Sequence, residues 1–305
     1  MTTIAQTDVE TAASFVTPSA FSAAEIQIEE FIDLEQFPIH DLNSPRRQEL
    51  LEHCRKGLKE SGCAHIANFI RPEAVKLMQD EADRLMHLAR QADGQINPYL
   101  TPDDPTLPER HPKRFFEPRT SSFINANLLE DQSLLRKIYD CDVVIKFLAD
   151  CLEQGPIFRW ADPLARNPYS VMKDGDYFPW HFDGNDFGIS ILVQEADEGG
   201  VFEWVPDLRT PNDERFDEVT QVLFDGDRTR VKTLPLKCGD LQLFKGRYSM
   251  HRVTTTYGKP RIIALPTYVT NPYTVNRPHH AKAFYGETLP IHHEREMDHV
   301  DSLTD

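Results

Sequence analysis

The sequence is poor in cysteine and contains no closely spaced cysteine pair. Its five cysteines are odd in number and lie far apart, and no C-x-x-C motif occurs. That pattern argues against a disulfide framework of the kind found in small secreted proteins. We therefore expect reduced cysteines and a cytoplasmic protein.

Basic residues and long apolar runs are also scarce. Lys and Arg number 33 against 49 Asp and Glu, which gives a formal net charge of −16. Such a charge repels phosphate backbones, so we expect neither nucleic-acid nor anionic-membrane binding. No apolar run approaches the roughly 18 residues of a membrane-spanning helix, and the first residues lack the basic and apolar regions of a signal peptide. A small molecule is the expected partner, while the oligomeric state is left open.

The chain divides into three parts by composition. Residues 1–25 are rich in Thr, Ala and Ser and predict a flexible leader. Residues 26–275 predict a single domain, helical over 26–155 and built of strands over 156–275. Residues 276–305 form a tail rich in His and acidic residues, which we expect to be solvated.

Helix signals mark the first half of the chain. Ser44 can cap a helix that Gly62 ends, and Pro72 can open a second helix. Apolar spacing predicts a third helix over 131–153. The proline-rich stretch 99–118 predicts a long loop, for which a lid is one role.

The second half consists of short β-branched and aromatic segments separated by Gly, Asp and Asn. This rhythm is typical of an all-β sandwich or barrel. Helices followed by strands predict an α+β fold, in which N-terminal helices pack on one sheet of a double-sheet jelly roll.

One triplet in this region carries metal-binding chemistry. His181 and Asp183 lie two residues apart, so their side chains project to the same side of an extended chain. In the strand-rich half before the tail, the one further histidine is His251. Two imidazoles and one carboxylate form the facial triad of non-haem Fe(II) oxygenases, which leaves three metal positions open for a 2-oxoacid and O2.

A 2-oxoacid co-substrate requires a buried cation for its far carboxylate. Arg261 lies ten residues after His251, at the head of a segment that we expect to return alongside the His251 strand. Its planar guanidinium suits bidentate binding of a carboxylate. Arg252 is the weaker candidate, because a residue adjacent to His251 on a strand faces the other way.

These residues resemble a known superfamily. The segments "HFD", "GGVFEWVP", "GDLQLFKGRYSMHRV" and "RIIALPTY" are similar to those of the Fe(II)/2-oxoglutarate-dependent oxygenases. Within that superfamily they are most similar to the BesD/HalD-type branch of amino-acid halogenases and hydroxylases. The resemblance implies a double-stranded β-helix, Fe(II) held by His181, Asp183 and His251, 2-oxoglutarate as co-substrate, and O2. It also implies release of succinate and CO2.

Asp183 selects between the reactions of this branch. Its halogenases carry a small residue at the position of the metal-binding carboxylate, which leaves room for chloride. A carboxylate there occupies the halide position, so the resemblance implies hydroxylation of a C–H bond. We expect the substrate to be a free amino acid, basic ones included.

Further site residues are weaker candidates. Asn167 and Tyr169 precede the H-x-D strand and are expected near 2-oxoglutarate or iron-bound water. The substrate candidates supply charge, amide or aromatic groups, and they are Trp204, Asn185, Asp162, Arg209 and Arg119.

Three alternatives remain open at this point. A cupin-like metalloenzyme with zinc or manganese would use the same three ligands without needing Arg261. A non-catalytic member of the fold would serve as a binding module. A hydroxylase or desaturase of a non-amino-acid natural product would share the whole cofactor site.

Overall fold

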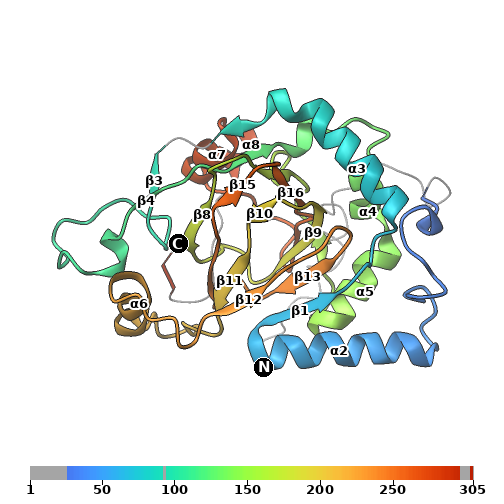
Figure 1. The fold of residues 1–305 in the computed structure, drawn as a ribbon, viewed down its shortest axis with the longest axis horizontal. Coiled ribbons are helices and arrows are strands. Elements are labelled where there is room, and N and C mark those ends of the chain that lie inside the picture. The colour runs from blue at the N-terminus through green and yellow to red at the C-terminus, as the bar shows by residue number, and fades with distance from the viewer. Residues whose placement is uncertain (1–25, 92–93, 296–302, 305) are drawn as a thin grey trace, which may run out of the picture.

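The computed structural model describes residues 26–91, 94–295 and 303–304. Within these ranges the protein is α+β, as predicted, with two main antiparallel sheets and helices gathered largely around one of them (Figure 1). No described helix combines the length and the apolar character needed to cross a membrane.

The larger sheet has seven strands. In spatial order they are β1 (Cys63–Ile66), β13 (Leu241–Phe244), β9 (Gly188–Gln194), β16 (Arg261–Ala264), β7 (Tyr169–Met172), β5 (Ser122–Ile124) and β2 (Arg90–Gln91).

The smaller sheet has four strands and bears both histidines of interest. Its order is β12 (Lys232–Leu234), β11 (Phe202–Val205), β14 (Met250–Val253) and β8 (Phe178–His181). Three two-stranded ribbons complete the β structure: β10 (Glu198–Gly199) with β15 (Thr256–Tyr257), β17 (Tyr268–Val269) with β6 (Phe158–Arg159), and β3 (Gln95–Ile96) with β4 (Glu117–Pro118).

The helices follow the signals in the sequence at most of their ends. The α-helices are α2 (Pro45–Ser61), α3 (Pro72–Leu85), α4 (Leu134–Asp140), α5 (Asp142–Leu152), α6 (Phe216–Phe224), α7 (Pro278–Tyr285) and α8 (Pro290–Glu294). Short 3-10 helices are η2 (Ile28–Glu30), η3 (Met86–Leu88), η4 (Pro112–Arg114) and η5 (Ala126–Leu128).

Local chemistry explains the ends of α2. The Ser44 hydroxyl accepts a hydrogen bond from the Arg47 amide at 3.4 Å, as a helix cap does. Gly62 ends the helix with φ of +67°, a conformation that costs glycine little. The single helix expected over 131–153 is instead two helices, because Cys141 adopts an extended conformation between α4 and α5.

The main core lies between the helices and the outer face of the larger sheet. Along β16, Ile262 and Ala264 join the core cluster that contains α2, α3 and α5 side chains, whereas Arg261 and Ile263 line a cavity on the other face. This alternation is the two-residue period of a strand. The larger sheet therefore separates a dry core from the functional cavity.

The tail departs from the expectation of a solvated segment. Over residues 276–295 it forms α7 and α8 against the body of the protein, and the His292 side chain is fully buried. Asp162 fixes this segment, because its carboxylate accepts hydrogen bonds from the Asn276 amide at 3.0 Å and from His292 Nε2 at 3.1 Å. The leader 1–25 and residues 296–302 lie outside the described residues.

Candidate active site

Two histidines face each other across the smaller sheet. His181 ends β8 and His251 lies on β14, and the two are direct partners in the antiparallel register. Directly opposite residues project to the same side, and the two imidazole centroids are 4.1 Å apart. Asp183 follows two residues after His181, as the H-x-D spacing predicts.

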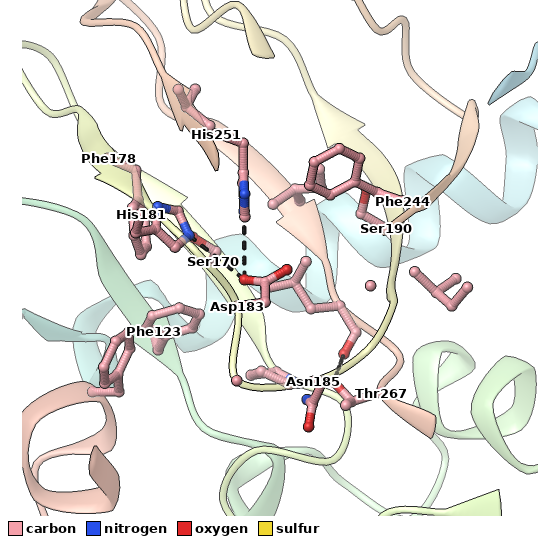
Figure 2. Close-up of a pocket in the computed structure, with 18 of the residues that line it drawn as sticks. Phe123, Ser170, Phe178, His181, Asp183, Asn185, Ser190, Phe244, His251 and Thr267 are labelled. Atoms are coloured by element: carbon pink, nitrogen blue, oxygen red, sulfur yellow. Dashed lines mark hydrogen bonds and ion pairs between the residues drawn. The ribbon is translucent and has the colours of Figure 1, made fainter. Parts of the chain in front are cut away.

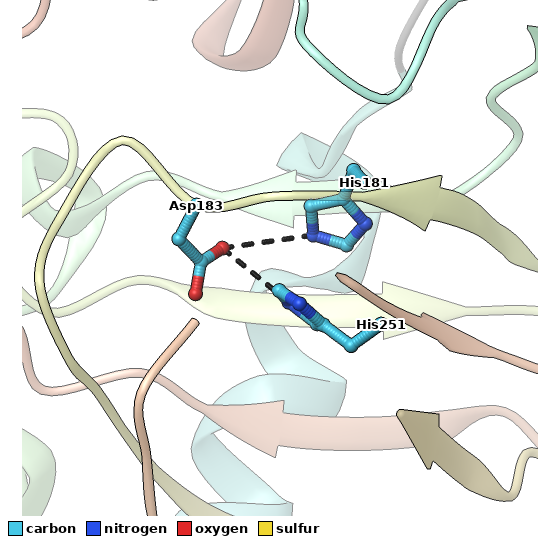
Figure 3. A group of neighbouring side chains, drawn as sticks. All are labelled: His181, Asp183 and His251. Atoms are coloured by element: carbon cyan, nitrogen blue, oxygen red, sulfur yellow. Dashed lines mark ion pairs between the residues drawn. The ribbon is translucent and has the colours of Figure 1, made fainter. Parts of the chain in front are cut away.

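The three side chains converge on one point (Figure 3). Asp183 Oδ1 lies 3.6 Å from His181 Nε2 and 3.4 Å from His251 Nε2. One ligand atom from each residue lies within 4.8 Å of the other two. This donor set of two nitrogens and one oxygen fits a divalent transition metal such as Fe(II).

Backbone carbonyls orient both imidazoles. His181 Nδ1 lies 2.8 Å from the Pro179 carbonyl, and His251 Nδ1 lies 3.0 Å from the Ser249 carbonyl. A carbonyl oxygen only accepts, so each Nδ1 carries the proton and each Nε2 presents a lone pair toward Asp183. The ring orientations required of metal ligands are thus fixed by the protein.

The electrostatics favour the metal-binding protonation states of His181 and Asp183. Burial, assisted by the neighbouring His251, lowers the pKa of His181 to about 3, so this imidazole is neutral at physiological pH. Burial opposes ionisation of Asp183, yet the two histidines hold the pKa of that carboxyl below its usual value. A neutral imidazole and an ionised carboxylate are the forms that bind a metal.

A glycine makes room for the carboxylate. The Asp183 amide donates to the Gly246 carbonyl at 3.1 Å. A Cβ atom added at Gly246 would lie 1.8 Å from Asp183 Oδ2, which no real structure tolerates. The turn before β14 therefore determines where the carboxylate can lie.

The triad opens into a cavity of about 260 Å³ between the two sheets (Figure 2). Aromatic rings line much of it, with the tilted Phe178 ring 4.2 Å from the His181 ring and the Phe244 ring 4.7 Å from the His251 ring in an edge-on arrangement. Polar side chains such as Ser170, Asn185 and Ser190 also line the wall. The cavity offers a mainly dry reaction chamber with a few hydrogen-bonding groups.

Arg261 lies on the wall opposite the histidines. We expected its strand to return alongside the His251 strand, and this expectation is wrong. Instead β16 pairs with β7 and β9 in the larger sheet, so Arg261 and His251 belong to different sheets that border one cavity.

The Arg261 guanidinium is buried and lacks a carboxylate partner among the described residues. Burial lowers its pKa to about 10, which still leaves it charged at neutral pH. Its neighbour Gly200 has no side chain, and a Cβ there would lie 2.8 Å from Arg261 Cδ. Arg252, by contrast, donates to Glu203 at 2.7 Å, away from the cavity.

Tyr169 and Asn167, which we expected near 2-oxoglutarate or iron-bound water, do not line the cavity. Tyr169 faces the core side of β7, where its hydroxyl donates to Glu81 of α3 at 2.9 Å. The strand period turns Ser170 and Met172 toward the cavity instead. Asn167 is buried just before β7 and does not line the cavity, although neither polar atom of its side chain has a hydrogen-bond partner.

Three of the proposed substrate residues also have structural partners in place of a substrate. Trp204 donates from its indole nitrogen to the Ser61 carbonyl at 2.8 Å. Arg209 pairs with Glu214 at 3.1 Å. Asp162 holds the tail, as described above. None of the three lines the cavity, whereas Asn185 does.

Sequence reasoning missed the contribution of the tail. Residues of α7 and of the segment before it line the cavity, and they are Asn276, Arg277, His280, Phe284 and Tyr285. Pro278 at a helix start and apolar residues at helical spacing after it were the signals of an amphipathic helix.

The solved structures to which the chain is similar include several oxygenases. An oxidoreductase of the 2OG-Fe(II) oxygenase family from Burkholderia pseudomallei is 12% identical, with a TM-score of 0.46 over 72% of this chain and 89% of its own. AviO1 from Streptomyces viridochromogenes Tue57 is 18% identical, with a TM-score of 0.49 over 73% and 94%. A prolyl-4-hydroxylase from Pseudomonas putida is 11% identical, with a TM-score of 0.42 over 70% and 96%.

No curated protein matches the chain. The family model for halogenase D (HalD) matches residues 46–283, which is well over half of the sequence. The matched range includes the His181–Asp183–His251 triad, Arg261 and most of α7. The protein is therefore an enzyme of the halogenase D family, within the Fe(II)/2-oxoglutarate-dependent oxygenases that the sequence motifs predicted.

Proposed function

We propose that the protein hydroxylates an unactivated C–H bond of a free amino acid. The observation that carries this proposal is the Asp183 carboxylate, which lies 3.4 Å and 3.6 Å from the two histidines. A carboxylate in that position occupies the place that a halide would need, so hydroxylation is favoured over halogenation. We also interpret the two sheets around the cavity as the double-stranded β-helix of the superfamily.

Within this proposal His181, Asp183 and His251 hold the metal. Fe(II), when bound, activates O2 while 2-oxoglutarate is converted to succinate and CO2, and one oxygen atom enters the substrate C–H bond. The protein excludes bulk water through the aromatic lining and holds the substrate carbon within reach of the open metal positions.

Arg261 is the proposed partner of the distal carboxylate of 2-oxoglutarate. Its guanidinium is buried on the cavity wall, and Gly200 leaves space beside it. A buried cation without a carboxylate partner in the described part of the chain favours binding of an anion from solution. The fork of donors suits a bidentate contact.

Arg119 is the proposed anchor for the α-carboxylate of the substrate. Arg119 lies behind the cavity wall, with its guanidinium carbon 4.9 Å from the Phe178 ring and 4.0 Å from the Phe284 ring, and both of these rings line the cavity. The Nη2 atom is buried without a hydrogen-bond partner. Burial lowers the pKa of Arg119 to about 9, so it is charged at pH 7 and able to bind a carboxylate.

Apart from Arg277 and His280 of the tail, the remaining lining favours an uncharged side chain on the substrate. Phe123, Phe187, Phe202 and Leu265 line the chamber, and Asn185 supplies an amide for a polar contact. Apolar walls stabilise an apolar body more than the basic side chain that the acidic composition suggested. We therefore narrow the proposed substrate to an amino acid with an apolar or neutral side chain.

One proposal about domain organisation accompanies this function. We propose that residues 26–295 form one catalytic domain, because the tail segment 276–295 supplies part of the chamber wall. The cupin-like alternative loses its basis, since membership of the halogenase D family and the buried Arg261 both point to 2-oxoglutarate chemistry.

The test is anaerobic purification, Fe(II) reconstitution and measurement of succinate with each of the common L-amino acids. A substrate should raise succinate release well above the substrate-free rate and gain the mass of one oxygen atom. His251→Gln should abolish this release, whereas Asp186→Asn, at an exposed position, should keep it. Succinate at background with every amino acid and with iron bound would refute the amino-acid proposal.

A further inference from the structure

We propose that Leu100 is a specificity-determining residue, whose side chain limits the size and polarity of substrates entering the cavity. This proposal rests on the proposed function for its substrate class. Leu100 lies at the start of the proline-rich loop and lines the same cavity as His181 and Asp183. It is partly exposed, as expected for a residue at the mouth of a chamber.

The backbone of Leu100 is strained. Its φ is +57°, in the left-handed region that L residues with a branched apolar side chain rarely adopt. Glycine would adopt this conformation freely, and asparagine would do so with little penalty. Leucine in this conformation costs conformational energy that glycine would avoid. We take this cost as a sign that the Leu100 side chain has a role in the cavity.

Leu100 differs from the other described residues that have a positive φ. Among the described residues, five other than glycine have a positive φ, and they are Asn68, Leu100, Glu153, Asp207 and Arg215. Four of them are polar and lie away from the cavity. The one apolar member is the one that lines the chamber.

A buried asparagine enforces the strained turn. Asn97 is fully buried, and its Oδ1 accepts hydrogen bonds from the Tyr99 amide at 2.9 Å and the Thr101 amide at 3.2 Å. Its Nδ2 donates to the Thr101 carbonyl at 2.9 Å and to the Lys113 carbonyl at 2.7 Å. The Leu100 amide in turn donates to the Asn97 carbonyl at 3.1 Å. The side chain of Asn97 therefore acts as the frame that holds Leu100 in place.

The turn is fastened to the segment that bears the metal ligands. The Phe182 amide, between His181 and Asp183, donates to the Pro98 carbonyl at 2.9 Å. The Tyr99 ring packs 5.4 Å from the Phe182 ring. The position of Leu100 is thus set relative to the triad rather than to the outer part of the loop.

The outer part of the proline-rich loop contacts a different element of the protein from Leu100. This part packs on α6, with the His111 ring 4.5 Å from Phe216 and the Phe115 ring 5.0 Å from Phe224. Leu100 is the one residue of 99–118 that lines the cavity. If this loop selects substrates, the side chain that does so is therefore Leu100.

The proposal is tested with Leu100→Gly, which removes both the strain and the side chain. Thermal stability should be maintained or increased, because the backbone relaxes. Acrylamide quenching of tryptophan fluorescence should increase at least about twofold, because Trp160 lines the cavity while Trp180 and Trp204 do not. The same variant in a Trp160→Phe background should lose this increase.

The second readout is substrate preference. Leu100→Gly should shift succinate release toward amino acids with larger side chains, and Leu100→Asn, which tolerates the conformation, should raise KM for apolar ones. Glu153→Gly is the matched control, since it relieves the same left-handed strain at the end of α5, away from the cavity. It should change neither quenching nor preference.

The outcomes separate this proposal from the proposed function. Unchanged quenching in Leu100→Gly, or an equal increase in Glu153→Gly, would overturn the role of Leu100. An unchanged ranking of amino acids in both Leu100 variants would do the same. A wild-type enzyme without an amino-acid substrate would refute only the substrate class, and the quenching comparison would still decide whether Leu100 closes the chamber.

Discussion

Gly246 accepts a hydrogen bond from the Asp183 amide and leaves the space that the Asp183 carboxylate occupies. A methyl group at position 246 would lie 1.8 Å from Asp183 Oδ2. We predict that Gly246→Ala displaces the carboxylate and weakens Fe(II) binding about 10- to 100-fold, as changes around metal ligands do. Metal titration measures this effect. Gly155→Ala is the control, because nothing lies within 4 Å of the added atom, and equal affinities of the two variants would contradict the prediction.

Asp183→Gly should abolish hydroxylation. It removes the one oxygen ligand and leaves a gap beside Gly246 that a chloride ion can enter. Product mass spectrometry in chloride-containing buffer distinguishes loss of reaction from chlorination. Full hydroxylation in the variant would show that Asp183 is not a metal ligand.

Arg261→Gln should raise the KM for 2-oxoglutarate by at least about 30-fold, since removal of one partner of a buried charge pair costs about 2 kcal/mol or more. Arg261→Lys should recover part of the loss, because it keeps the charge without the bidentate fork. Arg252→Gln is the control, since Arg252 pairs with Glu203 and not with the co-substrate, and it should leave the KM for 2-oxoglutarate unchanged. An unchanged KM in Arg261→Gln would assign co-substrate binding to another residue.

We predict that the stability of the protein depends on pH through the Glu81 carboxyl. Burial raises the pKa of Glu81, although Ser133 and Tyr169 donate hydrogen bonds to it. The folded state therefore holds this proton more tightly than the unfolded state, and its contribution to stability is lost as the pH rises through the folded pKa.

Glu81→Gln mimics the protonated form at every pH. The midpoint of thermal unfolding of this variant should exceed that of the wild type by a margin that grows from pH 4.5 upward. Glu52→Gln, at an exposed position of α2, should show no such growth. A margin that shrinks with rising pH would contradict the assignment.

We predict that Asp162 holds the tail segment against the cavity wall. Its carboxylate accepts five N–H hydrogen bonds, from Leu164, Ala165, His292 and both the main chain and the side chain of Asn276. Asp162→Ala leaves these donors buried, which should cost at least about 3 kcal/mol. Hydrogen exchange in residues 278–294 should increase more than in β9. Equal increases in both segments would indicate general unfolding instead.

The triad was predictable because its determinants are local. His181 and Asp183 share a side through the two-residue period of an extended chain, and His251 was the one histidine left in the strand-rich half. Arg261 lines the cavity although its strand neighbours differ from those expected, because a residue on either sheet can border a cavity between them. Strand order depends on long-range pairing, which sequence spacing does not reveal.

The expected site residues that do not line the cavity share a physical reason. Tyr169 has the chemistry of a site residue, yet strand alternation turns it to the core and turns Ser170 to the cavity. Asp162 has a carboxylate suited to an ammonium group, yet five protein donors already surround it. Tertiary contacts determine whether a polar group already has hydrogen-bond partners within the protein. Composition and spacing in the sequence do not reveal these contacts.

The contribution of α7 to the chamber means that the catalytic centre and part of the substrate wall lie on separate stretches of the sequence. The metal ligands end at His251, whereas Phe284 and Tyr285 come more than thirty residues later. Mutations can therefore reshape that wall in evolution without altering the metal centre. A chimera that exchanges residues 276–295 between relatives would transfer this part of the wall as a single module.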